Sequence, residues 1–549
     1  MLDPLPRLFY LKNKVIMTHM VSRLKWRLHI PMMTLFKFFP FLCLSFALFA
    51  SGTDNVSAES NSARPNIIFI LADDMGYGDV SALNPEGKIQ TPQLDRLAAE
   101  GIYFTDMHTP SSVCTPTRYG LLTGRYSWRS ALKSGVLGGY SRPLIEPKRL
   151  TLASMLKESG YHTAVIGKWH LGIDWTENAD GPKKAPNARD YQEQNIDFSR
   201  PFTNGLLAYG FDYFFGISAS LDMPPYVYLE NDRASEVPTT RKQWVREGAA
   251  AESFEAVDVL PKTTEKAIEY IESRAEAVKQ GTPFFLYFPL TSPHTPILPV
   301  EPWKGASGIN SYADFVMQTD DTVGQIVKKV DELGLGENTI IIFTADNGCS
   351  PAANINQLIE HGHYPNGIFR GHKADIFDGG HRVPFLVRWT AKIEPGTHSD
   401  QLACLTDMMR TFSDIIGTTL PDTAGEDSVS MLPALLGTAS EPLRTEVIHH
   451  SINGSFAIRQ GEWKLALCPD SGGWSDPRPN SPGVENLPPH QLYNMQSDVR
   501  ETSNLQAEHS RQVEQMMEAL QEIVDNGRST PGEPQQNNGT VTIQRRAAP

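Results

Sequence analysis

Asn66-Ile-Ile-Phe-Ile-Leu-Ala-Asp-Asp74 carries the clearest structural signal in this chain. Its first part, Asn66–Leu71, is apolar and rich in β-branched residues, which is typical of a strand buried inside a parallel sheet. The carboxylates of Asp73 and Asp74 follow directly. Because ligands bind at the carboxyl ends of strands in open α/β sheets, this stretch predicts both a fold class and the edge at which a polar site lies.

The alternation of strand and helix patterns continues along most of the chain. Helical patterns occupy 91–101, 151–159 and 312–333, and strand patterns occupy 161–166, 283–290, 339–344 and 383–389. Strand–helix alternation predicts an α/β fold in which a mainly parallel sheet carries helices on both faces.

The pattern changes after about residue 440. Short strand patterns separated by glycine turns occupy 446–451, 455–460 and 463–468, and a helical pattern occupies 507–524. They predict a small C-terminal antiparallel sheet with a helix. We therefore expect an α/β domain over 63–440 and a C-terminal subdomain over 441–526. A disordered tail is expected over 527–549, where Pro, Gln, Asn and Gly accumulate.

Residues 1–52 have the features of a signal or leader segment. Basic residues come first, followed by the uncharged and mostly apolar stretch Phe38–Ala50. This stretch is short for a membrane span and suits a signal h-region, so we expect export to the periplasm or the extracellular space without a stable membrane anchor. The leader is long, which makes an internal start at Met17 or Met32 one option. An N-terminal anchor is the alternative interpretation.

Composition limits the partners and the kinds of site. The net charge of −14 argues against binding to nucleic acids or anionic membranes. A local group of cations would still bind an anionic substrate. The five cysteines are Cys43, Cys114, Cys349, Cys404 and Cys468. Their spacing fits no zinc motif. Cys43 leaves with the leader, and if Cys114 is modified, the remaining three allow one disulfide at most.

The segment Ser112-Val-Cys-Thr-Pro-Thr-Arg-Tyr-Gly-Leu-Leu-Thr-Gly124 places a cysteine in a Ser/Thr/Pro turn before an apolar, helix-like run. Arg118 follows Cys114 by one helical turn, so the two side chains can lie together if the segment is helical. One interpretation is a thiolate nucleophile activated by the arginine. The other is a buried structural cysteine, which is the commoner role of a lone cysteine.

The Cys-x-Pro-x-Arg pattern with the following apolar pair and Thr-Gly resembles the signature of type I sulfatases, arylsulfatase-like members of the alkaline-phosphatase superfamily. The resemblance covers about residues 64–530. It implies an alkaline-phosphatase-like α/β fold with a small C-terminal subdomain, and an enzyme that hydrolyses sulfate esters, with sulfated carbohydrates or small molecules as substrates. It also implies that a formylglycine-generating enzyme oxidises Cys114, and that the hydrated aldehyde attacks sulfur to give a sulfoenzyme.

Acids and an amide at two strand ends suggest a metal site. Asp73 and Asp74 end the first strand, and Asp346 and Asn347 end a late one. Carboxylate and amide oxygens suit Ca²⁺ or Mg²⁺, although each pair alone is also compatible with a solvated turn. The resemblance implies one Ca²⁺ per chain, with the modified side chain of Cys114 as a further ligand.

Four further side chains fall where the resembled family places its sulfate-binding and proton-transfer residues. They are Lys168, His170, His294 and Lys373. Each alone would more often be structural. The resemblance implies that Lys168 orients the nucleophile together with the arginine of the signature, that His294 or Lys373 protonates the leaving alcohol, and that His170 acts on the second hydroxyl to release sulfate.

Two residues depart from the family pattern. Asp378 stands where a glutamate is expected before Gly-Gly-His-Arg, and we give it no catalytic role. His372 precedes the lysine in a segment where small residues are usual, and packing is its expected role. Cys349, close to the metal pair, is expected to be a buried inert thiol. The segments 174–205 and Ser218–Tyr228 are candidates for sugar recognition, with ordinary loop packing as the alternative.

Two other functions remain to be separated from sulfate ester hydrolysis. A phosphomonoester or phosphonate monoester hydrolase of the same fold can also use formylglycine, and relative rates on aryl sulfate and aryl phosphate would distinguish it. A non-catalytic binder of sulfated glycans would be expected to lack at least one site residue, whereas every expected position is filled here.

Overall fold

The computed structural model describes residues 64–181 and 188–544. The predicted leader, with Phe38–Ala50, lies outside these residues. None of the helices within them combines the length and apolar composition that a membrane crossing requires.

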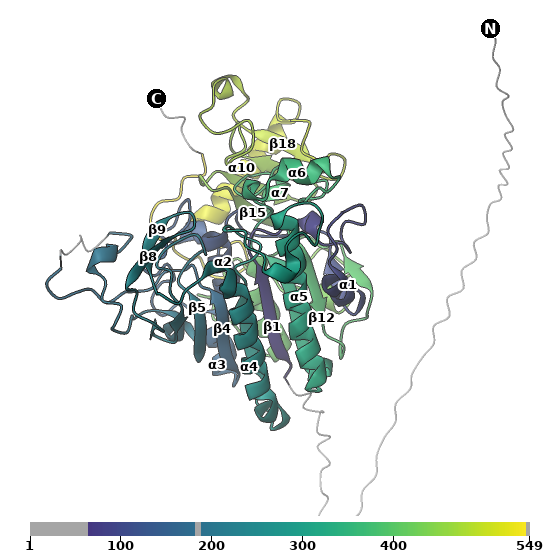
Figure 1. The fold of residues 1–549 in the computed structure, drawn as a ribbon. Coiled ribbons are helices and arrows are strands. Elements are labelled where there is room, and N and C mark those ends of the chain that lie inside the picture. Colours follow the sequence, from purple (N-terminus) through teal and green to yellow (C-terminus); the bar gives the residue numbers. More distant parts are fainter. Residues whose placement is uncertain (1–63, 182–187, 545–549) are drawn as a thin grey trace, which may run out of the picture. The chain divides into compact units, whose positions relative to one another are not determined.

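A ten-stranded sheet forms the centre of the fold (Figure 1). Its spatial order is β13-β2-β12-β11-β1-β10-β4-β5-β6-β7. In chain order the strands are β1 (Asn66–Ala72), β2 (Ile102–Phe104), β4 (His162–Lys168), β5 (Tyr213–Ile217), β6 (Leu229–Glu230), β7 (Arg233–Ala234), β10 (Phe284–Pro289), β11 (Thr339–Ala345), β12 (Phe385–Arg388) and β13 (Thr397–Ser399). The pairs β11–β1, β1–β10, β10–β4 and β4–β5 are parallel, and β12 runs antiparallel to β11. The predicted α/β class with a mainly parallel sheet is therefore confirmed.

Helices cover both faces of this sheet, and others pack beside the C-terminal strands. They are α1 (Pro92–Ala99), α2 (Cys114–Thr123), α3 (Leu152–Glu158), α4 (Val259–Lys279), α5 (Ser311–Glu332), α6 (Ile355–Glu360), α7 (Asp378–His381), α8 (Met408–Ile416), α9 (Leu432–Leu435) and α10 (Ser510–Asp525). Helices α1, α4 and α5 pack in one group, and α2, α3 and α8 in another. Figure 1 shows α4 and α5 in front of the central strands.

Local sequence explains the best-defined elements. Every residue of β1 is buried, as expected for a central strand covered on both faces. Thr151 caps α3 by accepting a hydrogen bond from the amide of Ser154, and Asn310 caps α5 by accepting one from Ala313. The sequence patterns did not predict α4 or the strand β5.

Three smaller sheets complete the fold. A parallel pair joins β3 (Met107–His108) to β14 (Ala403–Cys404), and β8 (Thr240–Gln243) pairs antiparallel with β9 (Glu247–Ala250). The predicted C-terminal antiparallel sheet has four strands: β15 (Glu446–His450), β16 (Phe456–Gln460), β17 (Trp463–Ala466) and β18 (Gln491–Asn494).

The C-terminal sheet shares a hydrophobic cluster with the segment after α2. Tyr126 and Trp128 pack in this cluster with Ile448 of β15, Phe456 of β16 and Leu520 of α10. Apolar packing therefore continues across the boundary predicted near residue 440, and the division at that residue stays a prediction.

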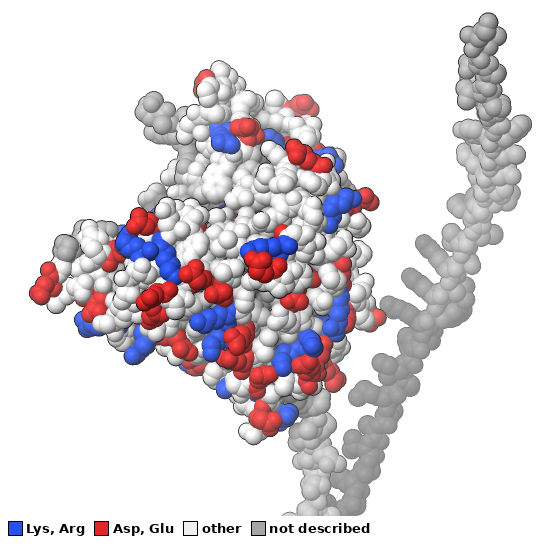
Figure 2. Space-filling model, in the orientation of Figure 1, with Lys and Arg blue, Asp and Glu red and all other residues white. Residues whose placement is uncertain are grey.

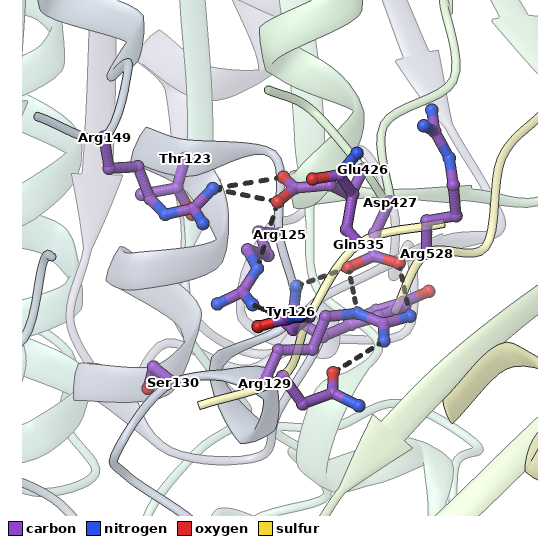
Figure 3. Close-up of polar contacts among 12 residues, drawn as sticks. Thr123, Arg125, Tyr126, Arg129, Ser130, Arg149, Glu426, Asp427, Arg528 and Gln535 are labelled. Carbon is purple, nitrogen blue, oxygen red and sulfur yellow. Dashed lines mark hydrogen bonds and ion pairs between the residues drawn. The ribbon is translucent and has the colours of Figure 1, made fainter. Parts of the chain in front are cut away.

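Residues 527–544 differ from the disordered tail that composition predicts. The backbone carbonyl of Gln536 accepts a hydrogen bond from Arg125, and Asn537 accepts one from Arg129. Ile543 packs in the hydrophobic cluster of the C-terminal sheet. Figure 3 shows Arg125 and Arg129 beside Glu426 and Asp427. The prediction of disorder was wrong here because buried arginines far along the chain offer partners that a composition count does not register.

Candidate active site

The predicted site residues gather where β1 and β11 end and α2 begins. Asp73 and Asp74 follow β1, Asp346 follows β11, and Cys114 is the first residue of α2. One ligand atom from each of Asp73, Cys114 and Asp346 lies within 4.8 Å of the others, and all three residues are buried. The amide of Asp346 donates to the carbonyl of Ala72 at 3.0 Å, which ties the two strand ends together.

Unsatisfied oxygens identify the part of this cluster that would hold a metal ion. The buried atoms Asp73 Oδ1 and Asn347 Oδ1 have no hydrogen-bond partner among the described residues. Asn347 Nδ2 donates to Asp74 Oδ1 at 2.8 Å, which turns the amide oxygen away from that carboxylate. Buried polar atoms are normally paired, and an oxygen-only donor set suits Ca²⁺, so the residues fit such an ion.

Three cations face the three carboxylates. Arg118 donates two hydrogen bonds to Asp346 Oδ2, at 3.0 and 2.7 Å. The other two pairs are Lys168 Nζ with Asp73 Oδ2 at 2.7 Å and Lys373 Nζ with Asp74 Oδ1 at 2.6 Å. The charges of these side chains therefore balance. A bound divalent cation would make the site positive, which suits an anionic ester.

Charge and burial set the acidity of two of these carboxyl groups in opposite directions. Burial, together with the charge of Asp73, raises the pKa of Asp346 to about 6. Burial would also raise the pKa of Asp73, but the cations Lys168, His294 and Arg118 hold it well below its usual range. Of these two carboxyl groups, Asp73 is therefore the one that stays ionised more firmly.

The two predicted histidines occupy different environments. His170 Nε2 lies 2.7 Å from the carbonyl oxygen of Leu137, while the buried Nδ1 has no partner among the described residues. Burial lowers the pKa of His170 far below its usual value, so the ring is neutral with a free lone pair on Nδ1. His294 Nδ1 lies 2.6 Å from the carbonyl oxygen of Thr295, and its Nε2 is 3.6 Å from Asp74.

Ser220 belongs to the same site, although no sequence pattern singled it out. Its hydroxyl accepts a hydrogen bond from Lys168 Nζ at 3.1 Å and lies 3.3 Å from both ring nitrogens of His294. The segment 218–228 was flagged only for sugar recognition. A lone serine in a loop has no local sequence signature. The one feature that could have pointed to it is the position of its loop directly after strand β5.

The aromatic residues of that loop do not support the predicted sugar-binding role. Tyr226 and Tyr228 are buried, and both pack against Phe254. Asp222 forms an ion pair with Arg246. Aromatic packing accounts for the two rings, while Asp222 Oδ1 and the Tyr228 hydroxyl have no hydrogen-bond partner among the described residues. The rings therefore favour ordinary loop packing over sugar binding.

The departures from the family pattern also have structural partners. Asp378 accepts a hydrogen bond from Lys464 Nζ at 2.7 Å. His372 Nδ1 is 2.9 Å from the carbonyl oxygen of Lys373, which agrees with local packing. Cys349 is buried, and burial raises its pKa well above its usual value, as expected of an inert thiol.

The cations of this site are internal rather than a surface patch. Figure 2 shows acidic and basic side chains interspersed over α4 and α5 on the face in view. Lys168 and Arg118 are buried, and Lys373 is nearly so. With a divalent cation bound, these local charges would attract an anion although the chain is acidic overall.

Comparison with known proteins identifies relatives. The family profile described as Sulfatase matches residues 65–418. N-acetylgalactosamine-6-O-sulfatase of Bacteroides thetaiotaomicron is 33% identical over 509 residues, covering 84% of this chain and 94% of the relative. Human arylsulfatase A is 31% identical over 482 residues, covering 84% of this chain and 87% of the relative.

Solved structures with a similar fold include sulfatases. A sulfatase structure from Bacteroides thetaiotaomicron, titled for the metabolism of multiple glycosaminoglycans, is 31% identical with a TM-score of 0.72, and the match covers 84% of this chain and 99% of that one. A structure titled as a complex with a neocarrahexaose shares the fold at 23% identity and a TM-score of 0.62, with 84% of this chain and 92% of that chain covered.

Proposed function

Because the chain belongs to the sulfatase family and is a sulfuric ester hydrolase, we propose that its nucleophile is formylglycine made from Cys114 and that one Ca²⁺ binds beside it. The observation that carries this proposal is the setting of Cys114. This residue begins α2 and is buried. One potential ligand atom from each of Cys114, Asp73 and Asp346 lies within 4.8 Å of the other two. Burial raises the pKa of this thiol, which argues against direct attack by a cysteine thiolate.

Three acids and one amide would hold the ion. Asp73, Asp74, Asp346 and Asn347 supply the oxygens, two of which have no hydrogen-bond partner among the described residues. Bound there, Ca²⁺ would lower the pKa of the attacking hydroxyl of the hydrated aldehyde and stabilise negative charge on the sulfate. Arg118 and Lys168, each bonded to one of these carboxylates, keep the acids ionised and oriented.

The two histidines would move protons on opposite sides of the reaction. His170 offers a neutral Nδ1 whose lone pair is free, because Nε2–H donates to Leu137; this nitrogen can accept the proton of the hydroxyl that expels sulfate. His294 and Lys373 both contact Asp74, and either can donate a proton to the leaving alcohol. Ser220 would orient His294 through its hydroxyl.

We propose a 6-O-sulfated N-acetylgalactosamine residue of a glycosaminoglycan as the first substrate to test. The names of the bacterial relative and of mammalian relatives at 28–31% identity support this choice. The segment 174–205 is the candidate for sugar recognition. Its Trp175 donates from Nε1 to the carbonyl of Gly139, two residues from the carbonyl that His170 contacts.

We further propose export of the mature chain without a stable membrane anchor, after maturation by a formylglycine-generating enzyme. The basic and apolar leader pattern supports export. This part of the proposal is tested by sequencing the N-terminus of secreted protein: a start beyond about residue 52 is expected. Recovery of the full leader in membrane fractions would contradict it.

The reaction itself is tested by comparing esters that share one leaving group. We expect kcat/KM for an aryl sulfate to exceed that for the matching aryl phosphate and phosphonate monoester by at least about 100-fold. Sulfate should also be released from N-acetylgalactosamine 6-sulfate in the presence of Ca²⁺. Faster hydrolysis of the phosphorus esters would instead favour the phosphoester hydrolase interpretation.

A further inference from the structure

A buried carboxylate that takes no part in the proposed reaction lies shortly after the metal ligands Asp73 and Asp74. This residue, Asp79, ends the short 3-10 helix Tyr77–Asp79, which follows β1. Its side chain is buried. Because a buried carboxylate is costly unless several donors hold it, its partners indicate what it does.

Asp79 accepts hydrogen bonds from three different segments of the chain. Its Oδ1 accepts from His363 Nε2 at 2.8 Å. Its Oδ2 accepts from the amide of Gly76 at 2.8 Å and from the hydroxyl of Tyr312, near the start of α5. The amide of Lys88 donates to His363 Nδ1 at 3.1 Å, so the ring proton is on Nε2. Donors on both oxygens hold the carboxylate in one orientation.

The metal ligand Asp74, which this network reaches through Tyr312, has an unusual backbone. Its φ is 67°, in the left-handed region that residues with a side chain rarely adopt. The Tyr312 hydroxyl lies 3.1 Å from the carbonyl oxygen of Asp74, so this carbonyl and the carboxylate of Asp79 share one donor. A left-handed residue of this kind persists where its surroundings hold it, and Tyr312 provides such a contact.

The left-handed conformation directs the polar groups of Asp74 into the active site. Its amide lies 3.3 Å from Asp346 Oδ1. Its carboxylate accepts from Asn347 Nδ2 at 2.8 Å and pairs with Lys373 Nζ at 2.6 Å. A change of φ at this residue would rotate the carboxylate away from these partners and from the oxygens that complete the proposed Ca²⁺ site.

The turn after Asp74 packs backbone to backbone against another segment. A Cβ atom on Gly76 would lie 2.0 Å from the carbonyl oxygen of Pro365, and one on Gly78 would lie 2.2 Å from that of Tyr364. The amide of Gly78 donates to the carbonyl of Pro365 at 2.8 Å. Since the two glycines offer no side chains, the shape of the turn depends on hydrogen bonds such as those of the carboxylate at its end.

We propose that Asp79, Tyr312 and His363 are positioning residues that hold Asp74 in its left-handed conformation and thereby raise the affinity of the active site for Ca²⁺. This inference rests on the Ca²⁺ site proposed above. All three side chains are buried, so they act through Asp74 and not on the substrate. Removing a group that orients a metal ligand typically weakens metal binding by about 10- to 100-fold.

The competing interpretation is a network that stabilises the fold alone. Its removal would then lower the unfolding midpoint and leave the Ca²⁺ affinity of the folded molecules unchanged. In the proposed role, the variants spend less time in the conformation that binds Ca²⁺, so the apparent Kd rises and a high Ca²⁺ concentration restores the site. Affinity and stability measured on the same variants separate the two interpretations.

The experiment titrates Ca²⁺ into the full-length protein, freed of metal by a chelator, in an isothermal titration calorimeter. Tyr312→Phe removes one hydroxyl and should raise the Kd for Ca²⁺ about tenfold, and Asp79→Asn, which sets an amide donor against other donors, should raise it by about 30- to 100-fold. His363→Ala should weaken binding about tenfold, whereas His363→Gln keeps a donor toward Asp79 and should stay within about threefold of wild type.

Activity provides a second measurement on the same proteins. At Ca²⁺ concentrations well above each Kd, kcat of Tyr312→Phe should return to within about twofold of wild type with an unchanged KM. A misfolded variant would not recover in this way. Tyr312→Phe is the smallest change and decides the question if Asp79→Asn does not fold.

Two control variants remove similar contacts elsewhere. The buried Tyr161 donates to the carbonyl of Pro65 at 2.9 Å, just before the start of β1. The buried Asp314 of α5 accepts from the amides of Gly305 and Ser307, both at 2.8 Å. Tyr161→Phe and Asp314→Asn should lower the unfolding midpoint and leave the Kd for Ca²⁺ within about twofold of wild type.

Two results would overturn the proposal, and they differ in what they say of the proposed function. If the wild type binds Ca²⁺ and Tyr312→Phe and Asp79→Asn bind it with the same Kd, the network only stabilises the fold and the Ca²⁺ site stands. If the wild type binds no Ca²⁺, the proposed metal site is wrong and the positioning role fails with it.

Discussion

Two buried clusters of charge lie at opposite ends of α2 and differ in how completely their atoms are paired. At its start, Arg118 and two lysines face the acids of the active site, and two oxygens, Asp73 Oδ1 and Asn347 Oδ1, have no hydrogen-bond partner among the described residues. Beyond its end, Asp427 accepts hydrogen bonds on both oxygens, including two from Arg129 (Figure 3). A fully bonded cluster stabilises the fold, whereas buried atoms left unpaired indicate where a ligand binds.

The largest expected effect concerns the active-site cluster alone. Cys114→Ser should reduce kcat for an aryl sulfate by at least about 10³-fold, because a serine cannot form the hydrated aldehyde. Its thermal unfolding midpoint should remain near that of the wild type. Cys404→Ala, a buried cysteine in β14, is the control and should keep its activity per folded molecule. Turnover of Cys114→Ser close to the wild-type rate would refute the formylglycine mechanism.

The second prediction concerns the ion pair of Arg129 and Asp427, where we expect a loss of stability and little change in activity. Arg129→Ala leaves Asp427 buried without its main partner, so the free energy of unfolding should fall by about 3–5 kcal/mol. Activity of the molecules that remain folded should stay within about twofold of wild type, since Arg129 does not contact the active site. Denaturant unfolding and active-site titration measure the two quantities. A selective loss of kcat with unchanged stability would show that the two clusters are not separate in function.

The third prediction uses acid to probe the same pair. Burial would raise the pKa of Asp427, but Arg129 holds it below its usual value, so the carboxylate stabilises the fold above the unfolded pKa and this stabilisation is lost as pH falls through the folded pKa. Asp427→Asn should therefore lower the free energy of unfolding at pH 7 by about 2 kcal/mol. This difference from wild type should shrink below about pH 4. A difference that is constant with pH would contradict the assignment.

The smallest expected effect concerns Ser220, which touches both Lys168 and His294. Ser220→Ala should lower kcat by about tenfold and leave KM and stability nearly unchanged, because the hydroxyl orients groups that act mainly in the transition state. Ser218→Ala in the same loop is the matched control. Equal losses in both variants would mean that the loop, and not the hydroxyl, matters.

The sequence predicted those features whose signals are local. The acids at Asp73 and Asp346 follow buried strands directly, and Arg118 is one helical turn from Cys114, so short stretches of sequence were enough to bring them together. Helix α4 was missed, although its buried residues lie along one face. Pro261 and two threonines near its start obscure the helical pattern.

Features that depend on distant contacts could not be predicted. Ser220 is a single residue without a motif, and only the folded chain shows that its hydroxyl contacts Lys168. The tail over 527–544 has a polar composition, but Asn537 and Gln536 bond to buried arginines that lie about 400 residues earlier. Composition describes what a segment can do alone and does not register partners supplied by the rest of the fold.

Peptide mass spectrometry of the fragment that contains Cys114 tests the central claim most directly. The protein would be produced together with a formylglycine-generating enzyme whose activity is verified on a control substrate. We predict the mass of formylglycine in place of cysteine at this position, in a fraction of molecules that matches the active fraction. An intact thiol at Cys114 in a fully active preparation would contradict the account.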